Sequence, residues 1–125
     1  MEILGLDHVQ LAMPVGGEAT ARPFYENLLG LKEMPKPEPL RRRGGCWFAG
    51  NGVQIHLGVT PDFTPARKAH PAFVVSDLEG LRQKLLAAGV EVVADTAVPR
   101  VHRFYAYDPF GNRLEFIQNG DGFNQ

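Results

Sequence analysis

The sequence predicts an α+β fold made of two βαβββ units, one in each half of the chain. Corresponding residues recur at a nearly constant spacing: His8 and His70 are 62 positions apart, and His56 and Glu115 are 59 apart. Each half also holds one segment with helical periodicity among segments that alternate as strands do. Two copies cannot propagate a stack, so the repeat is not that of a solenoid.

The first half begins with a strand and a helix. Leu4 to Met13 is apolar and β-branched enough to form a strand, and alternation places His8 and Gln10 on the same face of it. Glu18 to Leu29 has apolar residues at helical spacing. Gly30 follows directly and suits a helix C-terminus because glycine accepts positive φ.

Three further strands complete the first half. Leu31 to Met34 could begin the first of them, and a Pro-, Arg- and Gly-rich connection follows. Cys46 to Ala49 and Val53 to Val59 flank Gly50-Asn51-Gly52. Asn and Gly tolerate the positive φ of tight turns, so this stretch is typical of a hairpin.

The second half repeats this order. His70 to Val75 is expected to be a strand, and Ser76 with Glu79 forms a predicted capping box for the helix that follows. That helix has leucines at helical spacing and closes at Gly89. The strands then expected are Val90 to Val93, Arg103 to Tyr107 and Asn112 to Gln118, the last two joined by the turn residues Asp108-Pro109-Phe110-Gly111.

Length and composition describe an ordinary globular domain. The 125 residues suit one domain, with modules at about 1–60 and 70–119 and a linker at about 61–69. A net charge of −1 provides no basic surface for nucleic acid. No apolar run approaches the roughly 20 residues that span a bilayer, and no signal peptide is visible. The single Cys46 excludes an intrachain disulfide and favours a cytoplasmic location.

Four candidate metal ligands fall at matching points of the repeat. Because side chains alternate along a strand, each candidate lies on the more polar face of its strand. His56, for example, opposes Ile55 and Leu57. Imidazole with carboxylate is a set that divalent transition metals accept, so we expect a divalent ion (Zn, Ni, Mn, Co or Fe). The predicted metal ligands are His8, His56, His70 and Glu115.

Several stretches of the chain resemble the vicinal oxygen chelate superfamily, which includes glyoxalases, bleomycin-resistance proteins and ring-cleaving dioxygenases. The resemblance spans roughly residues 4–119 and is specific to the fold rather than to one reaction. The stretches that carry it are Leu6-Asp7-His8-Val9, Phe24-Tyr25-Glu26-Asn27-Leu28-Leu29-Gly30-Leu31, the strand ending in His56, His70-Pro71-Ala72-Phe73-Val74-Val75, and Tyr107-Asp108-Pro109-Phe110-Gly111-Asn112-Arg113-Leu114-Glu115-Phe116.

This resemblance implies a glyoxalase-like architecture, in which two βαβββ modules form a U-shaped mixed β-barrel with the helices outside. It implies that the four predicted ligands come from the first and last strand of each module. It also implies a homodimer, in which modules of two chains can share one barrel. Whether the site lies within one chain or across the dimer is left open at this stage.

The implied activity is that of a metal-dependent lyase or isomerase acting on a small molecule with vicinal oxygens. An octahedral ion with four protein ligands keeps two open positions, which two adjacent substrate oxygens can fill. By resemblance to lactoylglutathione lyase, Glu115 is the candidate catalytic base. That enzyme has a carboxylate where this chain has His56.

Three alternatives stay open. The first is a bleomycin-resistance-type protein that binds a small molecule without chemistry; such relatives generally lack the full ligand set. The second is an extradiol dioxygenase, which His8, His70 and Glu115 would suit if His56 were not a ligand. The third is a fosfomycin-type thiol transferase, although Gln10 stands where those enzymes tend to have Thr.

Substrate contacts are expected from polar residues on the ligand-bearing faces. Arg113 lies two residues before Glu115, on the same face of its strand, and could orient the carboxylate or a substrate anion. The predicted substrate-binding residues are Gln10, Gln54, Arg103, Tyr105 and Arg113.

Overall fold

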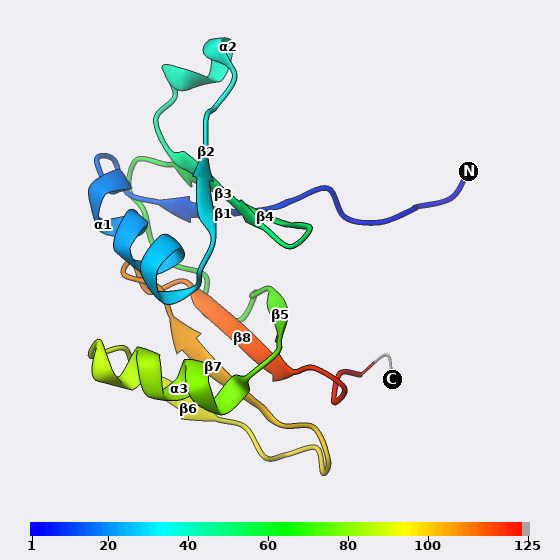
Figure 1. The fold of residues 1–125 in the computed structure, drawn as a ribbon. Coiled ribbons are helices and arrows are strands. Elements are labelled where there is room, and N and C mark those ends of the chain that lie inside the picture. Colours follow the sequence, from blue (N-terminus) through cyan, green and yellow to red (C-terminus); the bar gives the residue numbers. More distant parts are fainter. Residues whose placement is uncertain (124–125) are drawn as a thin grey trace. The chain divides into compact units, whose positions relative to one another are not determined.

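The protein is described by a computed structural model that covers residues 1–123. The chain divides into two compact units, Met1–Thr64 and a second that begins at Pro65. Each unit contains one four-stranded mixed sheet, and the two sheets have the same strand order, β1-β4-β3-β2 and β5-β8-β7-β6 (Figure 1). The predicted repeat of one helix and four strands is therefore present in both units.

In the first unit the first and last strands are parallel neighbours, and the other pairs are antiparallel. The helical segment lies along one face of this sheet (Figure 1). The elements are β1 (Val9–Met13), α1 (Glu18–Arg22), η1 (Pro23–Leu28), β2 (Lys32–Met34), α2 (Glu38–Arg41), β3 (Cys46–Gly50) and β4 (Val53–Val59).

The expected helix from Glu18 to Leu29 is not one regular α-helix. It is α-helical to Arg22 and continues as the π-helical turn η1, in which the backbone N–H of Leu29 donates to the carbonyl of Phe24 at 3.0 Å. Proline has no N–H to continue the α-helical ladder, so Pro23 removes one bond where the wider turn begins. Gly30, with φ of +74°, ends the segment as predicted.

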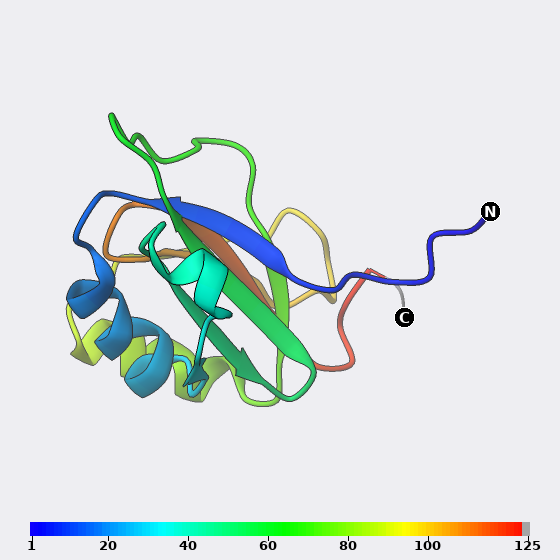
Figure 2. The same ribbon diagram turned by 90° about the horizontal axis from the view of Figure 1, so that it is seen from above.

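The first strand is shorter than expected, in part because its parallel partner β4 begins only at Val53. Val9 pairs with Ile55, so residues before Asp7 would lie beyond the start of β4 at Val53. Residues 1–6 instead run out from the sheet as an extended arm (Figure 2), with Leu4 91% exposed. The predicted strand from Leu4 therefore begins only at Val9.

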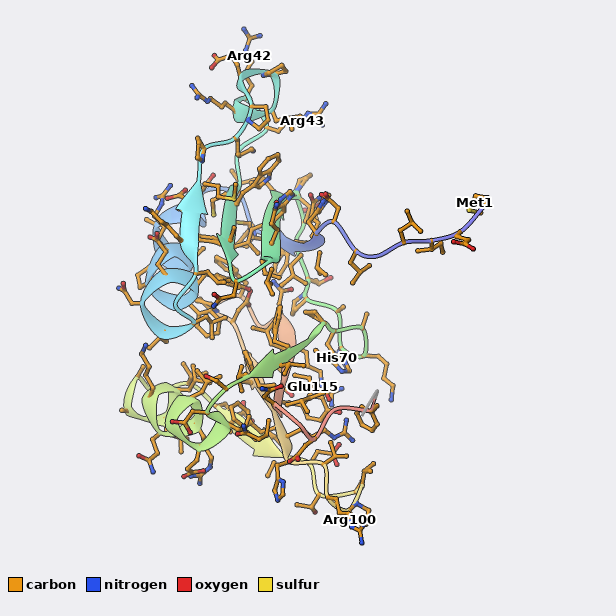
Figure 3. All side chains as sticks on the ribbon, turned by 45° about the vertical axis from the view of Figure 1, so that its right-hand side comes forward. Met1, Arg42, Arg43, His70, Arg100 and Glu115 are labelled. Atoms are coloured by element: carbon orange, nitrogen blue, oxygen red, sulfur yellow. The ribbon has the colours of Figure 1, made fainter. Side chains whose placement is uncertain are left out.

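The hairpin between β3 and β4 forms as predicted. Asn51 and Gly52 both have positive φ, +51° and +80°, the backbone conformation that this turn requires. The connection before it contains a short helix, α2, that the Pro- and Arg-rich sequence did not indicate. Figure 3 shows Arg42 and Arg43 at the outer end of this excursion.

The second unit repeats the arrangement, with β5 parallel to β8 and the other pairs antiparallel. Helix α3 lies along one face of its sheet (Figure 1). The elements are β5 (Ala72–Val75), α3 (Leu78–Ala87), β6 (Val92–Ala94), β7 (Arg103–Tyr107) and β8 (Arg113–Gln118).

The cap of α3 differs from the predicted capping box by one residue. The N-cap is Asp77, whose Oδ1 accepts from the backbone N–H of Gly80 at 3.0 Å. The Ser76 backbone carbonyl instead accepts from the side chain of Gln118 at 3.0 Å. An ionised carboxylate at this position also interacts favourably with the helix dipole, which explains the preference for Asp77.

Side chains alternate along β4 and β8, so core residues and candidate ligands lie on opposite faces of each strand. Ile55 and Leu57 are buried among apolar residues of the first unit, and His56 between them points to the opposite face. In the second unit Leu114 and Phe116 are core residues, with Glu115 between them. Among residues 1–123, no helix combines the length and hydrophobicity needed to cross a membrane.

Candidate metal centre

The four predicted ligands fall into two equivalent pairs, one in each unit. In the first unit Gln10 pairs with His56, so His8 lies two positions before the register partner of His56. In the second, Ala72 pairs with Glu115, so His70 has the same diagonal relation to Glu115. The sequence repeat thus becomes a geometric repeat between the first and last strands of each unit.

His70 and Glu115 are in direct contact. His70 Nε2 lies 2.9 Å from Glu115 Oε1, and Nδ1 of the same ring lies 2.8 Å from the backbone carbonyl of Lys68 (Figure 3). A carbonyl only accepts, so Nδ1 carries a proton and the neutral ring presents its lone pair at Nε2. That lone pair faces a carboxylate oxygen, so the pair requires a positive ion between its atoms, either a proton or a metal ion.

Glu115 is held from its other side by an arginine. The side chain of Glu115 is 5% exposed, and its Oε2 accepts from Arg103 Nη1 at 3.1 Å. Arg103 Nη2 in turn donates to Asp95 Oδ2 at 2.9 Å. The pKa of Asp95 is lowered, first by the backbone N–H of Ala97 and then by Arg103. This charged chain keeps the buried carboxylate in one orientation.

His8 and His56 are stacked in the first unit. Their ring centroids are 4.0 Å apart with an interplanar angle of 14°, and Trp47 stacks on His56 at 3.9 Å and 5°. His8 Nδ1 pairs with Asp7 Oδ2 at 2.8 Å, which leaves Nε2 for a ligand. His56 Nε2 lies 3.2 Å from Gln54 Oε1, so Nδ1 holds the lone pair of a neutral His56.

The surroundings of His56 favour the neutral form of its side chain. Burial lowers its pKa, and the nearby His8 lowers it further. A neutral imidazole is the form that binds a metal ion, because ligands must be deprotonated at the donor atom. The sandwich between Trp47 and His8 also fixes the ring plane.

The donor chemistry fits a divalent ion. Two ligand atoms at right angles, each about 2.1 Å from an ion, lie about 3.0 Å apart, close to the separation of His70 Nε2 and Glu115 Oε1. Within residues 1–123, no group of three or more His, Cys, Asp or Glu side chains is gathered as a metal site. In the described residues the predicted ligands lie in two separate pairs, His8 with His56 and His70 with Glu115.

The predicted substrate-binding residues also divide between the units. Gln10 extends over Gly58 on the neighbouring strand, and Gln54 contacts His56. In the second unit Arg103, Tyr105 and Arg113 share one face of the β7–β8 ladder with Glu115.

Tyr105 is the centre of this second group. The guanidinium carbon of Arg113 lies 3.9 Å from its ring centroid, and its hydroxyl accepts from Arg103 at 3.3 Å. Its ring meets that of His70 edge to face, with centroids 5.3 Å apart.

Sequence reasoning missed two contributors to these half-sites. Asp95, just after β6, lies in no motif, and only the fold brings it to Arg103. Lys68 contributes a backbone carbonyl, for which a sequence carries no signal beyond position. Trp47 belongs to the predicted hairpin strand Cys46 to Ala49, and its place directly opposite His56 in the β3–β4 register could have identified it.

Two cavities lie apart from the four predicted metal ligands. One, of about 390 Å³, is bounded by Glu33, Lys36 and Arg41 in the first unit. The other, of about 300 Å³, lies between the start of α3 and the β6–β7 connection. Of the predicted site residues, only Arg103 contributes to either cavity.

Similarity to known structures agrees with the fold. A glyoxalase-family protein from Bacillus anthracis is 52% identical, with a TM-score of 0.90 over 95% of this chain and 98% of that one. An integron cassette protein from V. cholerae is 25% identical, with a TM-score of 0.70 over 96% and 98%. The fosfomycin resistance protein FosX from Listeria monocytogenes, 20% identical, shares the fold at a TM-score of 0.74 over 94% and 95%.

None of the curated proteins matches this sequence significantly. The family model for the Glyoxalase/Bleomycin resistance protein/Dioxygenase superfamily matches residues 5–116, nearly the whole chain. The two four-stranded mixed sheets with the same strand order are the glyoxalase-like fold expected from the sequence. The chain belongs to the Glyoxalase/Bleomycin resistance protein/Dioxygenase superfamily.

Proposed function

We propose that this protein is a metal-dependent enzyme that binds vicinal oxygens of a small molecule and acts as a lyase or isomerase of the glyoxalase type. The metal ligands in this proposal are His8, His56, His70 and Glu115. The observation that carries it is the contact between His70 Nε2 and Glu115 Oε1 at 2.9 Å, because an imidazole nitrogen and a carboxylate oxygen are both atoms that bind divalent metal ions.

The proposal draws support from the way the half-sites are held. His70 is oriented by a backbone carbonyl and Glu115 by a guanidinium, and partners of this kind fix and tune metal ligands. A solved structure of the same fold, an E126Q variant of FosX from Listeria monocytogenes, contains Mn(II) and a dihydroxypropylphosphonic acid. That protein is 20% identical, so its ligand supports only the capacity of the fold.

In this proposal the bound divalent ion supplies Lewis-acid stabilisation of negative charge that develops on substrate oxygen. Glu115 takes the role of base and accepts a proton from the substrate carbon at a carboxylate oxygen. Arg103 holds that carboxylate in place through Oε2. Gln10 and Gln54 supply polar contacts from the first unit.

The experiment compares metal content and activity of the wild type with matched variants. Purified protein is dialysed against Mn²⁺, Ni²⁺ or Zn²⁺, and bound metal is measured per chain for the wild type, Glu115→Gln and His8→Ala. His102→Ala is the control, because His102 is a surface histidine paired with Asp121 at 2.6 Å. We expect the metal affinity of Glu115→Gln and His8→Ala to fall at least tenfold, and that of the control His102→Ala to equal the wild type.

Activity is then tested on the adduct of a 2-oxoaldehyde with a thiol, with and without chelator. Turnover that chelation abolishes and metal restores would support the enzyme. Variants that retain wild-type metal affinity would show that the ligands are wrongly assigned. Binding of small molecules that survives chelation, with little bound metal and no turnover, would favour the binding-protein alternative.

We also propose that the protein forms a homodimer. In the N-terminal arm, the apolar side chains of Ile3, Leu4 and Leu6 are each at least 87% exposed. Contiguous exposed apolar side chains are typical of a surface that binds another protein chain. Sedimentation of the wild type and of the Leu4→Ser/Leu6→Ser double variant tests this. A wild type that is monomeric at micromolar concentration would contradict the proposal.

A further inference from the structure

Arg113 is a partly buried guanidinium that makes no direct ion pair with an acidic residue among residues 1–123, although its charge lowers the pKa of Asp95. Its Nη1 donates only a long bond, 3.5 Å, to the backbone carbonyl of Arg67. Its Nε is buried and has no hydrogen-bond partner. The Nε of the neighbouring Arg103 is also buried without a partner. Arg103 differs in its terminal nitrogens, which are both paired with carboxylates, those of Asp95 and Glu115.

The unpaired atoms of Arg113 form one edge of the guanidinium. Nε–H and one N–H of Nη2 point in the same direction in the guanidinium plane, and neither has a partner in the described part of the chain. Two parallel donors on one edge match two oxygens of a carboxylate, phosphate or phosphonate. A buried N–H without an acceptor is unfavourable, so an oxyanion on this edge would remove a cost that the free protein bears.

Tyr105 holds this edge beside the candidate metal ligands. The ring of Tyr105 stacks under the Arg113 guanidinium at 3.9 Å and touches His70 edge to face. Arg113 and Glu115 lie on the same face of β8, two positions apart, which corresponds to about 7 Å along a strand. An oxyanion bound to Arg113 would therefore lie about 7 Å along the strand from the His70–Glu115 pair, a distance that one small molecule can span.

We propose that Arg113 binds an anionic group of the substrate through its Nε–Nη2 edge, so that the substrate is a small carboxylate, phosphate or phosphonate. The reacting oxygens of that substrate belong at His70 and Glu115, and this part rests on the proposed function. The anion contact itself depends only on Arg113 and Tyr105.

The test follows the arginine Nε–H resonances of the full-length protein by ¹H–¹⁵N NMR. Chelator-treated protein is titrated separately with methylphosphonate and with acetate, and the Arg113 resonance is assigned by its loss in Arg113→Lys. We expect a saturable shift of the Arg113 signal with at least one probe. Arg113→Lys should bind that probe at least tenfold more weakly, because an ammonium lacks the paired edge. The two arms separate phosphonate from carboxylate preference.

Arg82→Lys is the matched control, since Arg82 lies on the exposed face of α3 and pairs with Glu79 at 3.0 Å; it should bind the probe as the wild type does. An Arg113 signal that neither probe shifts overturns the proposal, and that result needs only the wild type. Equal affinity in wild type and Arg113→Lys overturns it as well. Metal content measured on the same samples tests the proposed function separately, because Arg113→Lys should retain wild-type metal binding.

Discussion

Arg103 reaches Glu115 diagonally across the β7–β8 ladder, with Nη1 of the arginine 3.1 Å from Oε2 of the glutamate. The register partner of Arg103 is Ile117, two positions further along β8. Diagonal neighbours on one face of a sheet are within reach of long side chains. Because Arg103 binds Oε2, the other oxygen of Glu115, Oε1, is available to contact His70, and the carboxylate has two partners.

Replacing Arg103 should therefore destabilise the protein more than replacing a surface arginine. Arg103→Leu leaves the carboxylate of Glu115 buried with one partner fewer, and we expect a loss of about 3 kcal/mol in the free energy of unfolding. Arg82→Leu breaks an exposed pair with Glu79 and should cost less than about 1 kcal/mol. Urea denaturation of both variants measures the difference, and equal costs would show that the buried pair has no special role.

Gly45 should tolerate no side chain. It has φ of +86°, and a Cβ at this position would stand 2.2 Å from the backbone carbonyl oxygen of Leu57. Gly45→Ala combines backbone strain with a clash against β4, and we expect a loss above about 3 kcal/mol. Gly52 also has positive φ but open space around it, so Gly52→Ala isolates the conformational cost of about 1–2 kcal/mol. Thermal unfolding compares them, and similar losses would contradict the clash.

The N-terminus of α3 should depend on Asp77 rather than on Ser76. Asp77→Ala removes the acceptor of the Gly80 N–H and should lower the free energy of unfolding by about 1 kcal/mol. Ser76→Ala should stay within about 0.5 kcal/mol of the wild type, because only its backbone carbonyl makes an observed contact. Denaturant midpoints of the two variants decide between the residues, and the reverse order would restore the capping box.

The Cys46 thiol should react slowly in the folded protein. Burial raises its pKa to about 11, with a further contribution from the charge of Glu33. At pH 8 about one thiol in a thousand would be thiolate, against about one in ten for a cysteine with the ordinary pKa of 9.0. Alkylation by iodoacetamide at pH 8 should be at least about 100-fold slower than in urea-unfolded protein, and comparable rates would contradict the burial.

The same shift predicts a loss of stability at high pH. The folded state keeps the Cys46 proton to a higher pH than the unfolded state does, so folding binds protons between the two pKa values. The stabilising contribution is complete below the unfolded value, 9.0, and is lost as pH rises towards about 11. Cys46→Ala should flatten the pH dependence of unfolding in this window, and an unchanged slope would assign it to other groups.

Local rules predicted much of the fold. The Gly50-Asn51-Gly52 hairpin and the glycine at position 30 need only positive φ at one or two residues, which composition alone can indicate. Because side chains alternate along a strand, Glu115 was expected on the face opposite to Leu114 and Phe116, and in the structure these two residues are part of the core. These features depend on neighbours in the sequence.

Features that depend on distant partners escaped prediction. The first strand lacks the first residues expected of it in part because its parallel partner β4 begins only at Val53, which only the register reveals. The bond from Arg103 to Asp95 joins side chains eight residues apart, across a loop without regular structure. The π turn that begins at Pro23 was not predicted, because the apolar residues around it keep helical spacing although Pro23 lacks a backbone N–H. A sequence pattern locates a helix end only to within one or two residues, so it could not decide between Ser76 and Asp77 as the N-cap.

The pairing of the first strand with the last in each unit determines how the candidate side chains are positioned. His8 with His56, and His70 with Glu115, come from the first and last strands of one unit, which are far apart in the sequence but adjacent in the sheet. The geometry of each pair is therefore set inside a single sheet, by backbone hydrogen bonds rather than by the loops that connect the strands.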